Sequence, residues 1–186
     1  MAFMNFEQVL KALLSACEQR HIRYAMIGGF ALGVLGIPRA TADVDCLVHR
    51  DDLDRFDEAM RTLGYQRSIR TENASHYRHP ERAWGALDAL HAFRTYSVGM
   101  LDRAKLYPIF DGAAQIRVLN PEDVIGLKVQ ALANNPLRRA QDTADIQTLA
   151  DRYRDTLNWT RIQEYYALFD LQEEGRCLQK DFGHAG

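Results

Sequence analysis

Cysteine is scarce in this 186-residue sequence. The three cysteines, Cys17, Cys46 and Cys177, are odd in number and far apart, and none belongs to a C-x-x-C pair. This pattern argues against a disulfide framework and against a zinc site built on cysteine pairs. Because free, scattered cysteines are typical of a reducing compartment, we expect a cytoplasmic protein.

Long apolar runs are also missing. The first stretch, MAFMNFEQVLKALLSACEQRH, carries its charges inside the apolar pattern, which is unlike a signal peptide or a membrane span. No later segment is apolar for long enough to cross a bilayer. We therefore expect no membrane partner.

An excess of one charge is the third absence. Lysine and arginine number 23 against 25 acidic residues, a formal net charge of −2, which excludes a global electrostatic grip on nucleic acid. An RNA partner would need a local basic patch. Five arginines could form a basic rim of this kind around an acceptor site, and they could equally form a solvated charged face: Arg67, Arg70, Arg78, Arg82 and Arg94.

Hydrophobic residues, counted together with the aromatic ones, make up 47% of the chain, which is enough for a core. Their spacing differs between the two parts of the sequence. Residues 1–119 alternate helical and strand patterns, with later strands too close together for helical crossovers, so we predict a mixed sheet flanked by helices. Residues 120–186 read as helical only, a segment packed on that core. The strands are expected at 24–27, 43–48, 83–92 and 115–119, with one or two exposed strands in 65–79.

Helices are predicted by apolar spacing and by their end signals. Asn120-Pro121 and Asn135-Pro136 each place a capping asparagine before a proline, which is typical of a helix start. We expect a last helix over 159–180 and a frayed tail over 181–186. The amino-terminal part is expected to hold helices over 6–17, 30–35 and 51–63.

Two aspartates on the second expected strand, Asp43 and Asp45, carry the chemistry. Side chains of a strand alternate between its two faces, so these two carboxylates project from the same side. Carboxylates this close repel each other unless a cation lies between them, and Mg²⁺ or Mn²⁺ prefers oxygen ligands. This pair predicts a divalent metal site.

Two further features strengthen the metal interpretation. Gly28-Gly29 ends the first strand and lets the backbone approach a ligand closely, as a triphosphate requires. Asp88 lies between apolar residues on a later strand, where a lone carboxylate is costly unless it has a partner. Each feature alone has an ordinary structural explanation; their combination favours a site formed by Asp43, Asp45 and Asp88.

Other candidate residues have competing interpretations. Lys128 lies on an apolar helix face and suits either a nucleotide contact or a salt bridge with Asp142 or Asp145. Arg39 suits phosphate binding or bracing of its turn. Three histidines suggest zinc but lack cysteine or acidic partners in register, so we expect no zinc site there: His76, His79 and His91.

The motifs G-G-x-A and R-x-T-x-D-x-D together resemble the nucleotidyltransferase superfamily with a polymerase β-like core, and within it the AbiEii/AbiGii toxin-like proteins. The first motif is carried by Gly28, Gly29 and Ala31, and the second by Arg39, Thr41, Asp43 and Asp45. A rear match runs from Pro121 to Lys128 and from Arg138 to Asp145. The resemblance spans about residues 20–150 and implies a nucleotidyltransferase fold.

The resemblance also implies roles. Asp43, Asp45 and Asp88 would be the catalytic, metal-binding carboxylates for Mg²⁺ or Mn²⁺, with an NTP as substrate. Nucleotide or phosphate binding would fall to Gly28, Gly29, Arg39, Thr41, Lys128 and Asp142. Many family members have serine after the glycine pair, and this chain has Phe30, so a phosphate contact through a hydroxyl there is missing; Thr41 is a candidate substitute.

Three functions follow as hypotheses. The first is transfer of a nucleotide to a macromolecule, tRNA or protein, in a toxin-like role with a cognate antitoxin as partner. The second is adenylylation of a small molecule such as an antibiotic. The third is a non-catalytic nucleotide-binding module on the same fold.

Overall fold

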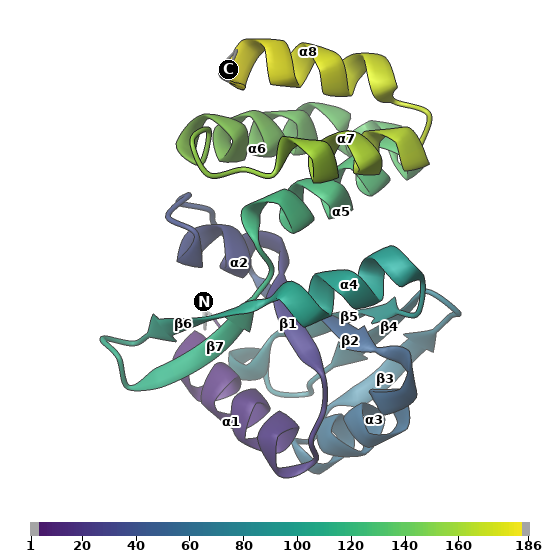
Figure 1. Cartoon of the computed structure of the whole chain (residues 1–186). Helices are drawn as coiled ribbons and strands as arrows, with labels where there is room; N and C mark the ends of the chain where they lie inside the picture. Colours follow the sequence, from purple (N-terminus) through teal and green to yellow (C-terminus); the bar gives the residue numbers. More distant parts are fainter. Residues whose placement is uncertain (1–3, 184–186) are drawn as a thin grey trace. The chain divides into compact units, whose positions relative to one another are not determined.

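A computed structural model describes residues 4–183 and divides the chain into two compact units, one ending at Leu119 and one beginning at Asn120 (Figure 1). Of the expected frayed tail, residues 184–186 lie outside the described range, and Asp181 and Phe182 belong to the last helix. Within residues 4–183, no helix combines the length and apolar character that a bilayer crossing needs.

The first unit is built on a seven-stranded mixed sheet, as the sequence predicts, with the order β3-β4-β5-β2-β1-β7-β6. Strands β2 and β5 pair in parallel, as do β1 and β7, and the other neighbouring pairs are antiparallel. The strands are β1 (Tyr24–Ile27), β2 (Asp43–His49), β3 (Gln66–Arg70), β4 (Ala74–Arg78), β5 (Ala86–Ala92), β6 (Lys105–Ile109) and β7 (Ala114–Val118).

Helices cover both faces of this sheet. Helices α1 and α3 lie on one side and α4 on the other, where it contacts β2 and β5 (Figure 1). Short 3₁₀ turns precede α3 and β5. The helical elements of this unit are α1 (Phe6–Gln19), α2 (Gly28–Val34), η1 (Arg50–Asp52), α3 (Leu53–Thr62), η2 (Arg82–Trp84) and α4 (Thr95–Arg103).

Alternation along β2 separates its core side from its site side. Val44, Cys46 and Val48 are fully buried, whereas Asp43 and Asp45 are half-buried. Burial raises the pKa of the Cys46 thiol well above its ordinary value, so Cys46 behaves as an apolar core residue. The strand thus presents carboxylates on one face and closes the core with the other.

One prediction for this unit is partly wrong. The segment 65–79 does form two strands, but only β3 is exposed along its whole length. Ser75 and Tyr77 of β4 are buried, and Tyr77 packs edge to face against Phe56 of α3. Strand β4 lies between β3 and β5, and α3 covers one of its faces. The many polar residues of this segment gave no sign of that burial.

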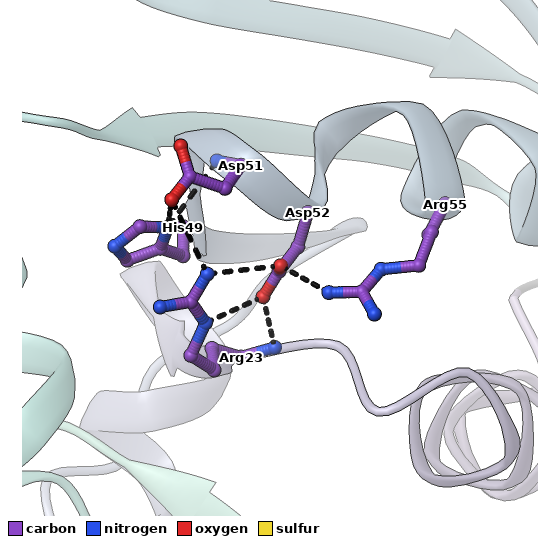
Figure 2. Close-up of polar contacts among 5 residues, drawn as sticks. All are labelled: Arg23, His49, Asp51, Asp52 and Arg55. Carbon is purple, nitrogen blue, oxygen red and sulfur yellow. Dashed lines mark hydrogen bonds and ion pairs between the residues drawn. The ribbon is translucent and has the colours of Figure 1, made fainter.

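A buried carboxylate fixes the start of α3 (Figure 2). Asp52 is fully buried and accepts hydrogen bonds from the Arg23 backbone N–H at 2.8 Å, from Arg23 Nε at 2.8 Å and from Arg23 Nη2 at 3.0 Å. Arg55 also donates to it. Burial alone would raise the pKa of Asp52, but these hydrogen bonds outweigh it and hold the pKa well below its usual range.

The second unit is helical, as predicted, but its last helix is not continuous. A break separates α7 from α8, and Asp170 within it adopts φ of 58°, which no helix allows. The helix expected from Asn135-Pro136 begins as a 3₁₀ turn. The elements are α5 (Pro121–Asn134), η3 (Pro136–Arg138), α6 (Arg139–Arg152), α7 (Trp159–Leu168) and α8 (Gln172–Phe182).

Candidate active site

Three aspartates share one face of the sheet. In the parallel pair of β2 and β5, Asp45 lies directly opposite Asp88, and Asp43 lies opposite Ala86. Neighbouring strands are about 4.8 Å apart and residues in register point the same way. The register therefore places Asp43, Asp45 and Asp88 side by side on the face opposite to Cys46.

The glycine turn holds Asp45 from the neighbouring strand. Gly28 begins α2 directly after β1 and has φ of 67°. A β-carbon on Gly28 would lie 2.0 Å from Oδ2 of Asp45, so the carboxylate packs against the bare α-carbon. Only glycine satisfies both the backbone conformation and this contact. We expected this helix to begin at Phe30; it begins at the glycine pair itself.

The second glycine packs against the loop that leads into β2. A β-carbon on Gly29 would lie 2.8 Å from Cβ of Thr41 and 3.4 Å from Cγ of Arg39. The Thr41 hydroxyl lies 3.0 Å from the Asp43 carbonyl oxygen and 3.1 Å from Asp43 Oδ1, so its single proton donates to one of them. Thr41 therefore braces Asp43, at its backbone or at its carboxylate.

Asp88 has a histidine partner. His76 of β4 is in register with Asp88, and its Nδ1 lies 2.8 Å from Asp88 Oδ1. Sequence reasoning considered His76 only as a zinc ligand and missed this contact. The pairing of β4 with β5 brings the two side chains together. The sequence signal that could have indicated this contact is a histidine and an aspartate on two strands that follow each other along the chain.

The donor chemistry of this face fits a hard divalent cation. Carboxylate oxygens are the ligands that Mg²⁺ prefers, and Mg²⁺ is commonly held by one or two carboxylates together with substrate phosphates. Within residues 4–183, no group of three or more His, Cys, Asp or Glu side chains is placed so that it could hold a metal ion by itself. The arrangement suits an ion shared with a phosphate better than a structural metal.

A cavity of about 820 Å³ adjoins the glycine turn and is bounded by Gly29 and Thr41. Phe30 lines it and stacks on Phe6 with ring centroids 6.0 Å apart. Phe30 is therefore a wall residue of the cavity in this chain. Arg39 lies in the same wall.

Lys128 and Asp142, the two candidates from the carboxyl-terminal motif, lie in the second unit. Lys128 Nζ donates to Asp142 Oδ1 at 3.0 Å and to Asp145 Oδ2 at 2.6 Å. The Oδ2 atom of Asp142 is buried and accepts no hydrogen bond from the described residues, although Arg138 Nε lies 3.9 Å away. The salt bridge considered for Lys128 is thus present, and it involves both aspartates.

Three of the other candidates have structural partners. Arg67 and Arg70 of the suggested basic rim form ion pairs with Asp57 of α3. His91 is buried between the Ser75 hydroxyl and the Glu72 carbonyl oxygen, at 3.0 and 2.9 Å. Burial lowers the pKa of His91, which favours the neutral ring.

Solved structures share this fold at low identity. The solution structure of the antibiotic-resistance factor ANT(2'')-Ia matches with a TM-score of 0.61 and 16% identity, over 96% of this chain and 98% of that chain. The lincomycin-bound lincosamide antibiotic adenylyltransferase LnuA matches with a TM-score of 0.55 and 17% identity, over 77% and 95%. An antigenic nucleotidyltransferase-like protein from Paracoccidioides brasiliensis matches with a TM-score of 0.55 and 16% identity, over 98% and 96%.

These matches define the nucleotidyltransferase fold, which the sequence predicted. A family model described as uncharacterised nucleotidyltransferase covers residues 4–174, so the chain belongs to that family and is a nucleotidyltransferase. A comparison with curated protein sequences gave no match.

Proposed function

We propose that this protein transfers a nucleotide from an NTP to an acceptor hydroxyl with the help of Mg²⁺, at the face formed by Asp43, Asp45 and Asp88. One observation carries the proposal: Asp45 and Asp88 are direct neighbours across parallel strands, with Asp43 on the same face. Carboxylate oxygens on one face of neighbouring strands are ligands that Mg²⁺ prefers, and substrate phosphates commonly complete its coordination.

Each residue has a proposed part. Asp43 and Asp45 would hold the metal ion, and Thr41 orients Asp43. Gly28 and Gly29 bring the backbone close to the phosphates. Asp88 either holds a second ion or accepts the proton of the attacking hydroxyl. Bound Mg²⁺ would neutralise charge on the phosphates and lower the pKa of the attacking hydroxyl. Arg39, Lys128 and Asp142 stay predicted nucleotide contacts on the resemblance alone.

For the acceptor we propose a small molecule. The charge balance of the chain gives RNA no general attraction, and Arg67 and Arg70 of the rim are engaged with Asp57. The named activity of LnuA, on lincosamides, supports the same class, as does the complex of ANT(2'')-Ia with adenylyl-2''-tobramycin. The competing hypothesis is transfer to tRNA or protein. In that case the protein would act as a toxin of the AbiEii type, with a cognate antitoxin as partner. We propose a cytoplasmic location, in keeping with three free cysteines.

The test uses purified protein, each α-³²P-labelled NTP and Mg²⁺ or Mn²⁺. A panel of hydroxyl-bearing antibiotics and a total tRNA sample serve as separate acceptors, and products are separated by chromatography. We expect labelled small-molecule product and released pyrophosphate. Labelled tRNA or labelled protein instead would overturn the acceptor class.

Matched variants test the site. Asp45→Asn should lower the transfer rate by about 100-fold or more, because it removes a charge that holds the metal. Asp111→Asn is the control, because Asp111 is an exposed carboxylate in the turn between β6 and β7. Its backbone is left-handed, a conformation that asparagine tolerates. Tight Mg²⁺–NTP binding without transfer would support the non-catalytic module, and neither binding nor transfer would overturn the proposal.

A further inference from the structure

We infer that His76 is a positioning residue for Asp88, which it holds in the orientation needed for metal and acceptor. This inference rests on the proposed function and adds a residue to it. The observation behind it is the 2.8 Å contact between His76 Nδ1 and Asp88 Oδ1.

The chemistry of the contact fixes its direction. An ionised carboxylate oxygen can only accept a hydrogen bond, so Nδ1 of His76 must carry the proton and donate it. This assigns the ring its Nδ1–H form whenever Asp88 is charged. Oδ2 takes no part in this contact and would be available to a metal ion or to the acceptor.

The backbone fixes the geometry of the pair. His76 and Asp88 are direct partners in the antiparallel pairing of β4 and β5, and Asp88 is in turn the direct partner of Asp45. Three neighbouring strands therefore align His76, Asp88 and Asp45 in one row across the sheet. A histidine on any other residue of β4 would face a different partner on β5.

A local irregularity lies on the outer side of this row. The register of β3 with β4 shifts between Arg67 and Ile69, and the Ser68 hydroxyl donates to the His76 carbonyl oxygen at 3.2 Å. Bulges of this kind commonly occur beside active sites, where they re-aim a side chain. Here the bulge and the Ser68 contact both act on the strand segment that presents His76.

The contact has little value as a stabiliser of the fold. The side chains of His76 and Asp88 are 35% and 29% exposed, and ion pairs that stay accessible to solvent contribute little to stability. Partners that orient metal-binding groups, in contrast, typically change metal affinity or activity by about 10- to 100-fold. The two roles therefore predict different results on substitution.

The experiment compares His76→Ala with His76→Asn, since the asparagine amide nitrogen takes the place of Nδ1 and restores the donor. Mn²⁺ binding to the full chain, measured by calorimetry, is the first readout, and kcat and KM for the NTP are the second. We expect His76→Ala to weaken Mn²⁺ binding about tenfold and to lower kcat by about 10- to 100-fold, with KM changed by less than about threefold. His76→Asn should recover most of both losses.

Leu106→Thr is the control, because Leu106 is also an exposed apolar residue of an edge strand, and its strand, β6, lies at the opposite edge of the sheet from β3. It should leave both readouts unchanged, and thermal unfolding should show all variants folded. Wild-type Mn²⁺ affinity and kcat in His76→Ala would overturn the inference, as would an Asn variant that is folded but as impaired as Ala. Because Mn²⁺ binding needs no acceptor, a wild-type protein that transfers nothing would count against the proposed function alone.

Discussion

Gly28 and Asp45 lie in direct contact, with no room for a β-carbon between the backbone of one and the carboxylate of the other. The contact links the turn after β1 to the second aspartate of β2, which pairs with Ile27 across the antiparallel strands. The glycine turn and the carboxylate pair, which are separated by about fifteen residues of chain, therefore form one structural unit.

Gly28→Ala should remove nucleotidyl transfer by displacing the Asp45 carboxylate. The new methyl group meets Oδ2 at 2.0 Å, and the backbone has φ of 67°, which alanine adopts only at a cost of about 1–2 kcal/mol. We expect Mn²⁺ binding and transfer to fall together, with a modest loss of thermal stability. Calorimetry and a transfer assay on the same preparation measure this.

The matched control lies in the same helix. A β-carbon on Gly33 would meet nothing within 4 Å, so Gly33→Ala should keep activity and stabilise the protein by about 0.5–1 kcal/mol. Equal activity of the two variants would show that Gly28 does not position Asp45.

Asp52→Asn should destabilise the fold by about 2 kcal/mol near neutral pH, because it removes the charge that accepts hydrogen bonds from Arg23 and Arg55. The folded pKa of Asp52 lies below its unfolded value of about 3.9, so this stabilisation is present above pH 4. It is lost as the pH falls through the folded pKa. The difference between wild type and variant should therefore shrink below pH 4 in urea unfolding.

Asp51 provides the control for this prediction (Figure 2). Its side chain is 74% exposed and lies 3.7 Å from Arg23 Nη2, so Asp51→Asn should change stability by less than about 0.5 kcal/mol. A gap between Asp52→Asn and wild type that stays constant with pH would contradict the assigned cause.

Lys128→Met should destabilise the second unit more than Asp142→Asn. The lysine variant leaves two buried carboxylates, Asp142 and Asp145, without their ammonium partner, which costs about 3–5 kcal/mol. The asparagine variant keeps the pair between Lys128 and Asp145. Chemical unfolding of both variants measures the order, and the reverse order would show that the lysine is not the central partner.

Asp170→Val should destabilise the break between α7 and α8 by about 1–2 kcal/mol, because the left-handed conformation of residue 170 excludes a β-branched side chain. Asp170→Asn should be neutral, since asparagine tolerates this conformation. Thermal unfolding distinguishes them, and equal melting temperatures would contradict the assigned strain.

The sequence predicted the elements that surround the carboxylates well, and the reason is local. Strand β2 alternates apolar and acidic residues, and β1 is a short apolar run ended by two glycines, so both follow from pattern alone. The start of α2 was misplaced because glycine is a poor helix former, and here the turn geometry of Gly28 overrides that preference.

What the sequence did not predict depends on pairing between distant strands. The contact of His76 with Asp88 requires the register of β4 on β5, and the Arg23–Asp52 network joins residues 29 positions apart. The division between α7 and α8 was missed because Asp170 gives no glycine or proline signal. We expected Asp88 to share a site with Asp43 and Asp45, but its position directly opposite Asp45 follows only from the register of β5 on β2.

The parallel pairing of β2 with β5 has a consequence for biosynthesis. A nascent chain that has reached the end of β4 already contains the glycine turn and the first two aspartates, yet the strand that contributes Asp88 is still to be translated. Parallel neighbours also need a long connection and form slowly. An emerging polypeptide is therefore without its third acidic group until β5 leaves the ribosome and inserts between β4 and β2.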